Sequence, residues 1–292
     1  MAKQSTRTDF FKKGRRLRKL NEFVYKMQSI TQKRVGKEEF IETEYGKIRT
    51  LWYGFNNKEK TPVLFTLHGG GFILMHADAD EPMNIKFNKS IGCKIISIDY
   101  AKAPEYPYPA AVNQIYAVVK HVYENADKYR IDKNIMAIGG HSAGGNLSAV
   151  TCLKAKRLGE FKFVCQVLDY PPLDLATSAF NKPQPKGTIS PKMAVMFDAC
   201  YIKPSQAKDP FVSPIYATKE DITGLPPALF ILAGGDSLHD EGMKYYKMLQ
   251  SAGVEVECIE YPKSSHGFTY LQTADSKDAI AKMSAFFAKF LN

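Results

Sequence analysis

The sequence predicts an α/β protein with a mostly parallel, doubly wound sheet. Its 292 residues suffice for one large domain. Six short and strongly apolar runs suit strands that are buried on both faces of a sheet. Stretches with helical spacing separate most of these runs, and such alternation is typical of parallel sheets. The apolar runs are 63–67, 95–98, 135–138, 163–168, 228–232 and 254–259.

The elements around these runs follow from their own patterns. Within residues 39–55, apolar and polar side chains alternate on both sides of Gly46 and Lys47, which predicts two strands joined by a turn at that dipeptide. Helices are expected where apolar residues recur every three or four positions. These stretches are 110–125, 144–158, 241–252 and 277–291.

Residues 1–38 form a basic N-terminal arm. Within residues 1–37, twelve Lys and Arg stand against two acids, whereas the rest of the chain holds 28 residues of each sign. Apolar residues recur along the arm, so we expect an amphipathic helix whose apolar face packs on its own domain. A second interpretation uses the charge, in weak contact with an anionic membrane or in binding of nucleic acid. The apolar positions are Leu17, Leu20, Phe23 or Val24, Met27 and Ile30.

One interval, 174–221, breaks the alternation of strands and helices. It contains six prolines and apolar residues of its own, and long inserts of this kind are seldom idle loops. We interpret it as an insertion packed above one edge of the sheet. The expected organisation is therefore an arm (1–38), a first core segment (39–173), the insertion (174–221) and a second core segment (222–292).

Composition excludes several classes of protein. Hydrophobic residues make up 45% and charged residues 24%, a globular balance that excludes collagen, coiled coils and wholesale disorder. No apolar run approaches the ~18 residues of a membrane-spanning helix, and residues 1–20 lack the apolar stretch of a secretory signal. The five cysteines are widely spaced, so we expect reduced thiols in a cytoplasmic protein. Metal-ligand spacing and GxGxxG are absent, so neither a metal nor a nicotinamide cofactor is expected.

The strongest local signal is the hexapeptide GHSAGG at residues 140–145. It stands between an apolar run and a helical stretch, which is the context of a nucleophile elbow. Glycines on either side relieve a strained turn that lifts the hydroxyl of Ser142 above the sheet. The alternative is a phosphate-gripping turn, but GxxxxGK[ST] is missing.

A second glycine cluster, HGGGF at residues 68–72, follows another apolar run. Its main chain can approach a substrate oxygen closely, so we expect the N–H groups of Gly70 and Gly71, with that of Ala143, to form an oxyanion hole. His68 and Gly69 are expected to support this loop.

A serine nucleophile needs a base and an acid, which follow it along the chain in this arrangement. Of the histidines beyond Ser142, His266 lies in a loop after the last apolar run, whereas His239 falls where a helix should begin. Asp236 follows the run at 228–232 and is preferred as the acid. Its alternatives are Asp240, placed in the first turn of a helix, and Asp169 and Asp174, which precede or open the insertion.

From residue 61 to the C-terminus the chain resembles the hormone-sensitive-lipase-like carboxylesterases of the α/β-hydrolase fold. Its HGGGF (68–72), DYAKAPEYPYPAA (99–111) and GHSAGGN (140–146) resemble that family's HGGG, DYRLAPEHPFPAA and GDSAGGN, and the regions around Asp236 and His266 resemble its acid and base segments. The resemblance implies Ser142 as nucleophile, Asp236 as acid, His266 as base, and a helical cap built from the arm and the insertion. In one departure, His141 stands where the family usually has Asp. In another, DSLHDE (236–241) lacks the Pro and Arg of DPLRDE.

These observations predict a serine carboxylesterase that hydrolyses short- to medium-chain acyl esters without a cofactor. Its expected partner is a small-molecule ester; nucleic acid is not expected, and no oligomeric state follows. Two alternatives remain. A serine peptidase of the same fold usually lacks HGGG and carries a propeller, for which the chain has no room. A non-catalytic binding protein would typically have lost one of the three site residues.

Overall fold

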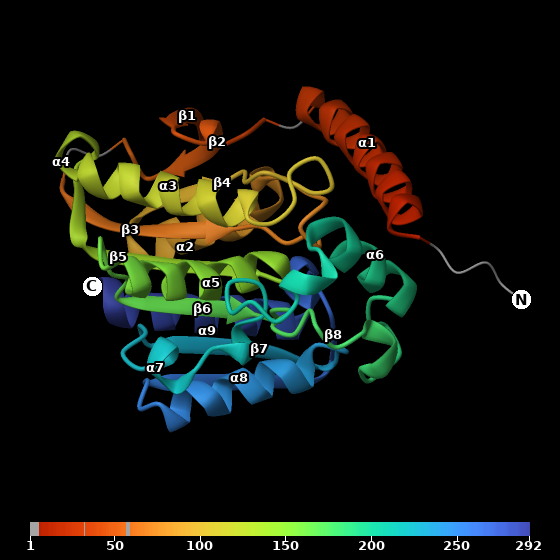
Figure 1. The fold of residues 1–292 in the computed structure, drawn as a ribbon. Helices are drawn as coiled ribbons and strands as arrows, with labels where there is room; N and C mark the ends of the chain where they lie inside the picture. The colour runs from red at the N-terminus through yellow and green to blue at the C-terminus, as the bar shows by residue number, and fades with distance from the viewer. Residues whose placement is uncertain (1–5, 32, 57–58) are drawn as a thin grey trace, which may run out of the picture.

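The computed structural model describes residues 6–31, 33–56 and 59–292. Within them, one eight-stranded sheet has the order β1-β2-β4-β3-β5-β6-β7-β8 (Figure 1). The strands are β1 (Lys37–Thr43), β2 (Gly46–Tyr53), β3 (Thr61–Leu67), β4 (Lys94–Ile98), β5 (Ile131–His141), β6 (Cys165–Asp169), β7 (Ala228–Gly235) and β8 (Val256–Ser265).

Most of the sheet is parallel, as the sequence predicts. Only β1–β2 and β2–β4 are antiparallel pairs, and β4, β3, β5, β6, β7 and β8 run parallel to one another. Each of the six apolar runs lies wholly or mainly in one of these strands, from β3 to β8. Helices cover both faces, so residues of β4 and β6 are buried on either side.

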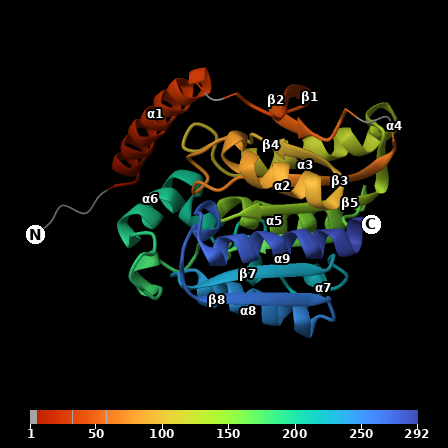
Figure 2. The ribbon, with the colours of Figure 1, turned by 180° about the vertical axis from the view of Figure 1, so that it is seen from behind.

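Two helical layers enclose the sheet. Helices α3, α5 and α8 cover one face and α2 and α9 the other, as Figures 1 and 2 show from opposite sides. The sequence predicts α3, α5, α8 and α9 to within a few residues, whereas α2 was not expected. The helices are α1 (Arg7–Thr31), α2 (Glu81–Ile91), α3 (Ala110–Glu124), α4 (Ala126–Tyr129), α5 (Ala143–Leu158), α6 (Pro191–Tyr201), α7 (Lys219–Ile222), α8 (His239–Ser251) and α9 (Ala274–Leu291). No helix in these ranges is long and apolar enough to cross a membrane.

The turn of the first hairpin lies two residues earlier than expected. Thr43 pairs with Gly46, so the turn consists of Glu44 and Tyr45. Thr43 Oγ1 accepts from the Tyr45 N–H (3.1 Å) and donates to the Gly46 carbonyl oxygen (2.9 Å). Gly46, with φ +96°, serves as the first residue of the return strand instead of as part of the turn.

Helix α1 packs beside α6 of the insertion, at the sheet edge where β5 gives way to α5 (Figure 1). The expectation that its apolar residues face the domain is confirmed for Leu17 and is wrong for the later positions. Phe10 and Leu17 are partly buried against the core, while the later apolar positions are exposed. The rest of the contact uses hydrogen bonds from polar side chains to main-chain carbonyls and close backbone approach. At Gly14, an added Cβ would lie 2.7 Å from Cys200 Sγ of α6.

Candidate active site

Ser142 occupies a strained turn between β5 and α5. Its φ of +52° and ψ of −119° lie in a backbone region that residues other than glycine rarely adopt. A Cβ on Gly144 would fall inside van der Waals contact of the carbonyl oxygen of Leu67, and one on Gly140 would collide with Gly144. The glycines of the motif therefore let the turn approach β3, and the turn projects Ser142 from the carboxyl edge of the sheet.

Three predicted residues meet at this edge. His266 Nε2 lies 2.9 Å from Ser142 Oγ, and His266 Nδ1 lies 2.6 Å from Asp236 Oδ2. Asp236 directly follows β7 and His266 directly follows β8, so neighbouring parallel strands deliver both side chains to one place. Asp236 is almost completely buried, and its second oxygen accepts hydrogen bonds from Thr188 Oγ1 (3.3 Å) and the Leu238 N–H (3.2 Å).

The alternative base and acid lie elsewhere. His239 begins α8 and pairs with Glu260 (2.8 Å) and Asp240 (3.1 Å). Burial acts to lower the pKa of His239, but its two acidic partners outweigh burial and raise it. Asp174 accepts hydrogen bonds within its own turn, from the main chain of the two residues at 176–177 and from a hydroxyl.

The glycine loop after β3 faces Ser142. Gly70 (φ +110°) and Gly71 (φ +59°) have left-handed backbones, and a Cβ on Gly71 would collide with the ring of Phe197 on α6. None of the loop and turn hydrogen bonds in the described chain uses the N–H of Gly70, Gly71 or Ala143. These donors are therefore available to an anion beside the serine.

Side-chain hydrogen bonds from Tyr100, His68 and Tyr270 hold the main chain of this loop in place. Tyr100 OH donates to the carbonyl oxygen of His68 (2.7 Å), and His68 Nδ1 donates to that of Gly69 (2.7 Å). Tyr270 OH accepts from the Gly69 N–H (3.3 Å) and donates to buried Asp80 (2.7 Å). Burial lowers the pKa of His68, so its imidazole is neutral near pH 7. This geometry agrees with the supporting role expected for His68 and Gly69.

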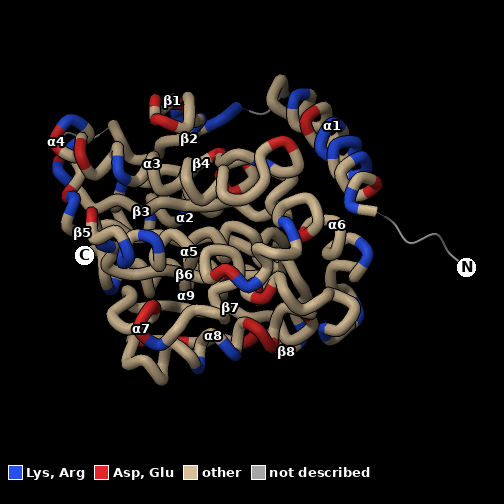
Figure 3. Tube along the Cα trace, viewed as in Figure 1, with Lys and Arg blue, Asp and Glu red and all other residues tan. Residues whose placement is uncertain are grey.

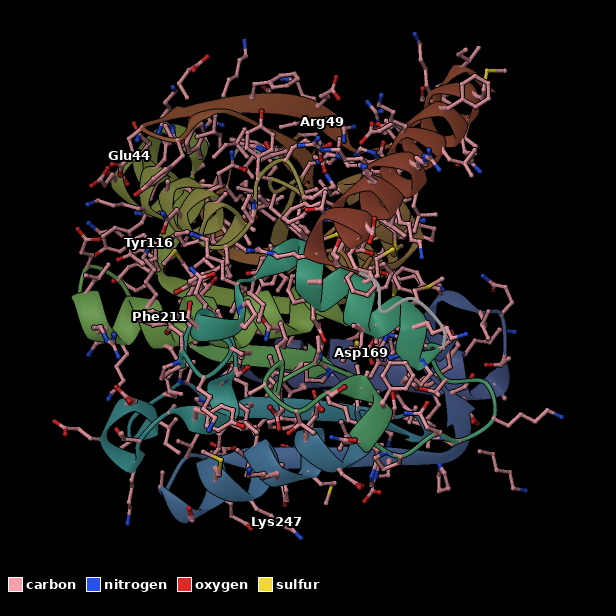
Figure 4. The ribbon with its side chains drawn as sticks, turned by 45° about the vertical axis from the view of Figure 1, so that its right-hand side comes forward. Glu44, Arg49, Tyr116, Asp169, Phe211 and Lys247 are labelled. Atoms are coloured by element: carbon pink, nitrogen blue, oxygen red, sulfur yellow. The ribbon has the colours of Figure 1, made fainter. Side chains whose placement is uncertain are left out.

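The sequence alone did not predict one contact next to the serine, a hydrogen bond between His141 and Asp169. His141 Nδ1 lies 2.6 Å from Asp169 Oδ2, and the same oxygen accepts from Thr269 Oγ1 (2.7 Å). The sequence singles out both residues, His141 as a departure from the family and Asp169 as a discarded acid. The signal that joins them is the register of two parallel strands, which sets His141 of β5 opposite Asp169 of β6. Figure 4 labels Asp169 at this edge.

A small pocket of about 50 Å³ opens beside Ser142. Its walls are mostly apolar and come from the glycine loop, from residues 172–189 and from α6. Two charged side chains also reach it. Lys182 pairs with buried Glu241 (2.6 Å), whereas burial raises the pKa of Asp198 to about 7. The described chain contains no cluster of His, Cys, Asp and Glu that could hold a metal ion.

Comparisons with known proteins identify the fold and the family of the chain. A family model described as the alpha/beta hydrolase fold matches residues 64–270. The carboxylesterase NlhH of Mycobacterium tuberculosis is 33% identical over 215 residues, 72% of this chain and 67% of the relative. The carboxylic ester hydrolase LipN of the same species is 35% identical over 235 residues, 77% of this chain and 62% of the relative.

A solved structure shows the same fold over more of the chain. The thermostable esterase of Pseudomonas putida ECU1011 superposes with a TM-score of 0.85 at 28% identity, covering 93% of this chain and 89% of that one. The predicted enzyme class, a carboxylic ester hydrolase, is confirmed by these relatives. The chain therefore belongs to the hormone-sensitive-lipase-like carboxylesterase family of the α/β-hydrolase fold.

Proposed function

We propose that this esterase acts through Ser142 as nucleophile, His266 as base and Asp236 as the acid that orients it. The observation that carries the proposal is the continuous hydrogen-bonded path from Asp236 through His266 to Ser142, with links of 2.6 and 2.9 Å. His266 Nε2 takes the proton of the hydroxyl as Ser142 Oγ attacks the ester carbonyl. Asp236 fixes the imidazole tautomer and stabilises the imidazolium that forms.

The carbonyl oxygen becomes negatively charged during this attack. The N–H groups of Gly70, Gly71 and Ala143 are proposed to bind it, since they are free of loop hydrogen bonds and Gly71 lines the pocket at Ser142. His266 then gives its proton to the departing alcohol. Water hydrolyses the acyl-enzyme with the same base, which restores the serine. Each donor of this kind is worth roughly 3 kcal/mol of barrier.

We propose short- to medium-chain acyl esters, from acetyl to hexanoyl, as the preferred substrates. Support comes from the volume of the pocket beside Ser142, about 50 Å³, and from Phe197 of α6, whose ring packs against Gly71 of the glycine loop. The arm (1–38) and the insertion (174–221) together form the cap in this proposal, flanked by core segments 39–173 and 222–292. Their contact at Gly14 and Cys200 supports that division.

The proposed setting is the cytoplasm, and the proposed partner is a small-molecule ester. All five cysteines are free, and four of them are buried among apolar side chains. Buried thiols that stay reduced suit a reducing compartment.

The test is hydrolysis of p-nitrophenyl esters from acetyl to palmitoyl, with a butyryl p-nitroanilide as the peptidase-type substrate. We expect the highest kcat/KM between acetyl and hexanoyl and little anilide cleavage. A fluorophosphonate should label wild type and the control variant Ser251→Ala, whose serine is exposed on α8, but not Ser142→Ala. A label that persists in Ser142→Ala would reject the assigned nucleophile, and a maximum at palmitoyl would reject the short-chain preference.

A further inference from the structure

Helix α1 has an inner face that is fully engaged with the protein. Near its start, Arg7 Nε donates to a carbonyl oxygen of α6 (3.1 Å). Further along the same face, Arg18 Nη1 donates to the carbonyl oxygen of Lys102 (2.7 Å). Toward the end, Tyr25 OH donates to Asp78 (3.0 Å). These contacts fix the rotation of the helix about its axis, so its opposite side is held away from the body.

That opposite side is apolar in its second half. The residues that form it, named here the outer stripe, follow one another at steps of three, one, three and three positions, which places them on one face. Their exposed fractions are 59% for Leu20, 63% for Phe23, 42% for Val24, 53% for Met27 and 72% for Ile30. Figure 4 shows this end of α1 standing out from the sheet, with side chains projecting away from the body. Contiguous exposed apolar surface of this kind marks an interaction site.

The same outer face is basic in its first half. Lys12, Lys13 and Arg16 precede the outer stripe at helical spacing, and Lys19 and Lys26 flank it; all five are exposed. None of the ion pairs among the described residues involves these five side chains. Figure 3 shows the resulting band of Lys and Arg along α1. This helix therefore presents unpaired cations beside an apolar stripe.

We propose that the outer stripe docks α1 on an anionic lipid surface, with the helix lying in the plane of the interface. A basic amphipathic helix binds lipid by placing apolar side chains among the acyl chains and cations among the headgroups. Charge decides between this occupant and a second copy of the chain. Two copies joined through α1 would bring like charges together, because the excess of ten positive charges lies entirely within residues 1–37.

Nucleic acid is the other polyanion to consider. Its phosphates would engage the five cations, but they offer no apolar surface in which the side chains of the outer stripe could be buried. Lipid satisfies both halves of the face at once. Docking also brings the site toward the bilayer, because the inner face of α1 packs on α6, whose Phe197 lines the pocket at Ser142.

The experiment measures binding of the full chain to sedimented vesicles, which needs no catalytic activity and so fails independently of the proposed function. The probes are vesicles of pure phosphatidylcholine and vesicles with 30% phosphatidylglycerol, each at 0.1 and 0.5 M NaCl. We expect binding only to the anionic vesicles, with a large loss at the higher salt concentration. Each cation near the surface contributes a factor of about five.

Two variants separate the occupants. Leu20→Ser/Phe23→Ser/Ile30→Ser removes the centre of the outer stripe and should weaken vesicle binding at least tenfold, with unchanged melting temperature and p-nitrophenyl butyrate hydrolysis. The matched control Phe40→Ser/Leu158→Ser removes two exposed apolar residues from the body and should bind as wild type. Equal binding by the stripe variant would overturn the proposal. So would a wild-type dimer in light scattering that the stripe variant loses, or tight binding to duplex DNA in place of vesicles.

Discussion

His141 and Asp169 form a buried pair directly under the nucleophile, with Nδ1 and Oδ2 2.6 Å apart. The pair joins the last residue of β5 to the last residue of β6, and Ser142 follows His141 in the chain. Burial raises the pKa of Asp169, and the acidic neighbours Asp80 and Asp169 raise the pKa of His141 against the effect of burial. A hydrogen bond between the ends of two neighbouring strands therefore holds the turn that carries Ser142.

We predict that this pair makes stability depend on pH. A folded pKa above the unfolded value means that the folded chain keeps a proton that the unfolded chain has released. For His141, the stabilisation is complete below the unfolded pKa of ~6.5 and is lost as pH rises through the folded value. Urea unfolding at pH 6 and pH 8 should show a lower free energy of unfolding at pH 8. In His141→Asn the difference should shrink, and an unchanged difference would contradict the role of this histidine.

Breaking the pair should be most costly at pH 6, where His141 carries its proton. His141→Asn leaves Asp169 buried without its cationic partner, a change that typically costs about 3–5 kcal/mol. In His141→Asn/Asp169→Asn both ionisable groups are gone, so part of that loss should be recovered. A double-mutant cycle from urea unfolding measures the coupling. Additive effects of the two substitutions would show that the contact contributes no coupling free energy to stability.

The choice of base can be tested with two histidines. His266→Gln removes the group 2.9 Å from Ser142 Oγ and should lower kcat by about 10⁴-fold or more, as losses of triad members do. His239→Gln is the matched control, since His239 instead pairs with exposed Glu260 of β8 (2.8 Å). Its kcat should stay within about twofold of wild type on p-nitrophenyl butyrate. The reverse pattern would exchange the two assignments.

Asp198 should set the alkaline side of the pH profile. Its pKa of about 7 means that the pocket beside Ser142 gains a negative charge as pH rises through neutrality. An apolar acyl chain then meets an ionised carboxylate, so kcat/KM for p-nitrophenyl butyrate should decline between pH 6.5 and 8.5. Asp198→Asn keeps the shape and should remove this decline, whereas exposed Asp240→Asn should not. Superimposable profiles for Asp198→Asn and wild type would rule out this carboxyl as the cause.

The glycine loop offers a test of the oxyanion hole. Gly71→Ala places a Cβ against the ring of Phe197 at φ +59° and should displace the loop. Loss of one donor costs about 10²–10³ in kcat. Gly224→Ala is the control, because its φ of +77° is equally strained but its Cβ would meet open space. The control should lose stability alone; an equal loss of kcat in both variants would point to general destabilisation.

Local patterns explain how much could be predicted from the sequence. Short apolar runs locate β3 to β8, and two glycine motifs locate Ser142 and the loop at Gly70 and Gly71, because those constraints act within a few neighbouring residues. His141 and Asp169 could not be paired in this way, since their contact depends on the register of two strands 28 residues apart. For α1, periodicity identifies an apolar face correctly but carries no information about which molecule that face meets.

Gly14→Leu and Lys19→Leu test the two faces of α1 separately. Gly14 lies on the inner face, where even a Cβ would approach Cys200 Sγ to 2.7 Å. Gly14→Leu improves helix propensity by about 0.8 kcal/mol, so any destabilisation must come from overpacking against α6, which typically costs about 1–3 kcal/mol. Displacing α6 also moves Phe197 in the pocket, so KM for p-nitrophenyl butyrate should rise. Lys19→Leu adds the same side chain to the exposed face and should change neither the melting temperature nor KM. If Gly14→Leu matches Lys19→Leu in both measurements, α1 does not act as part of the cap.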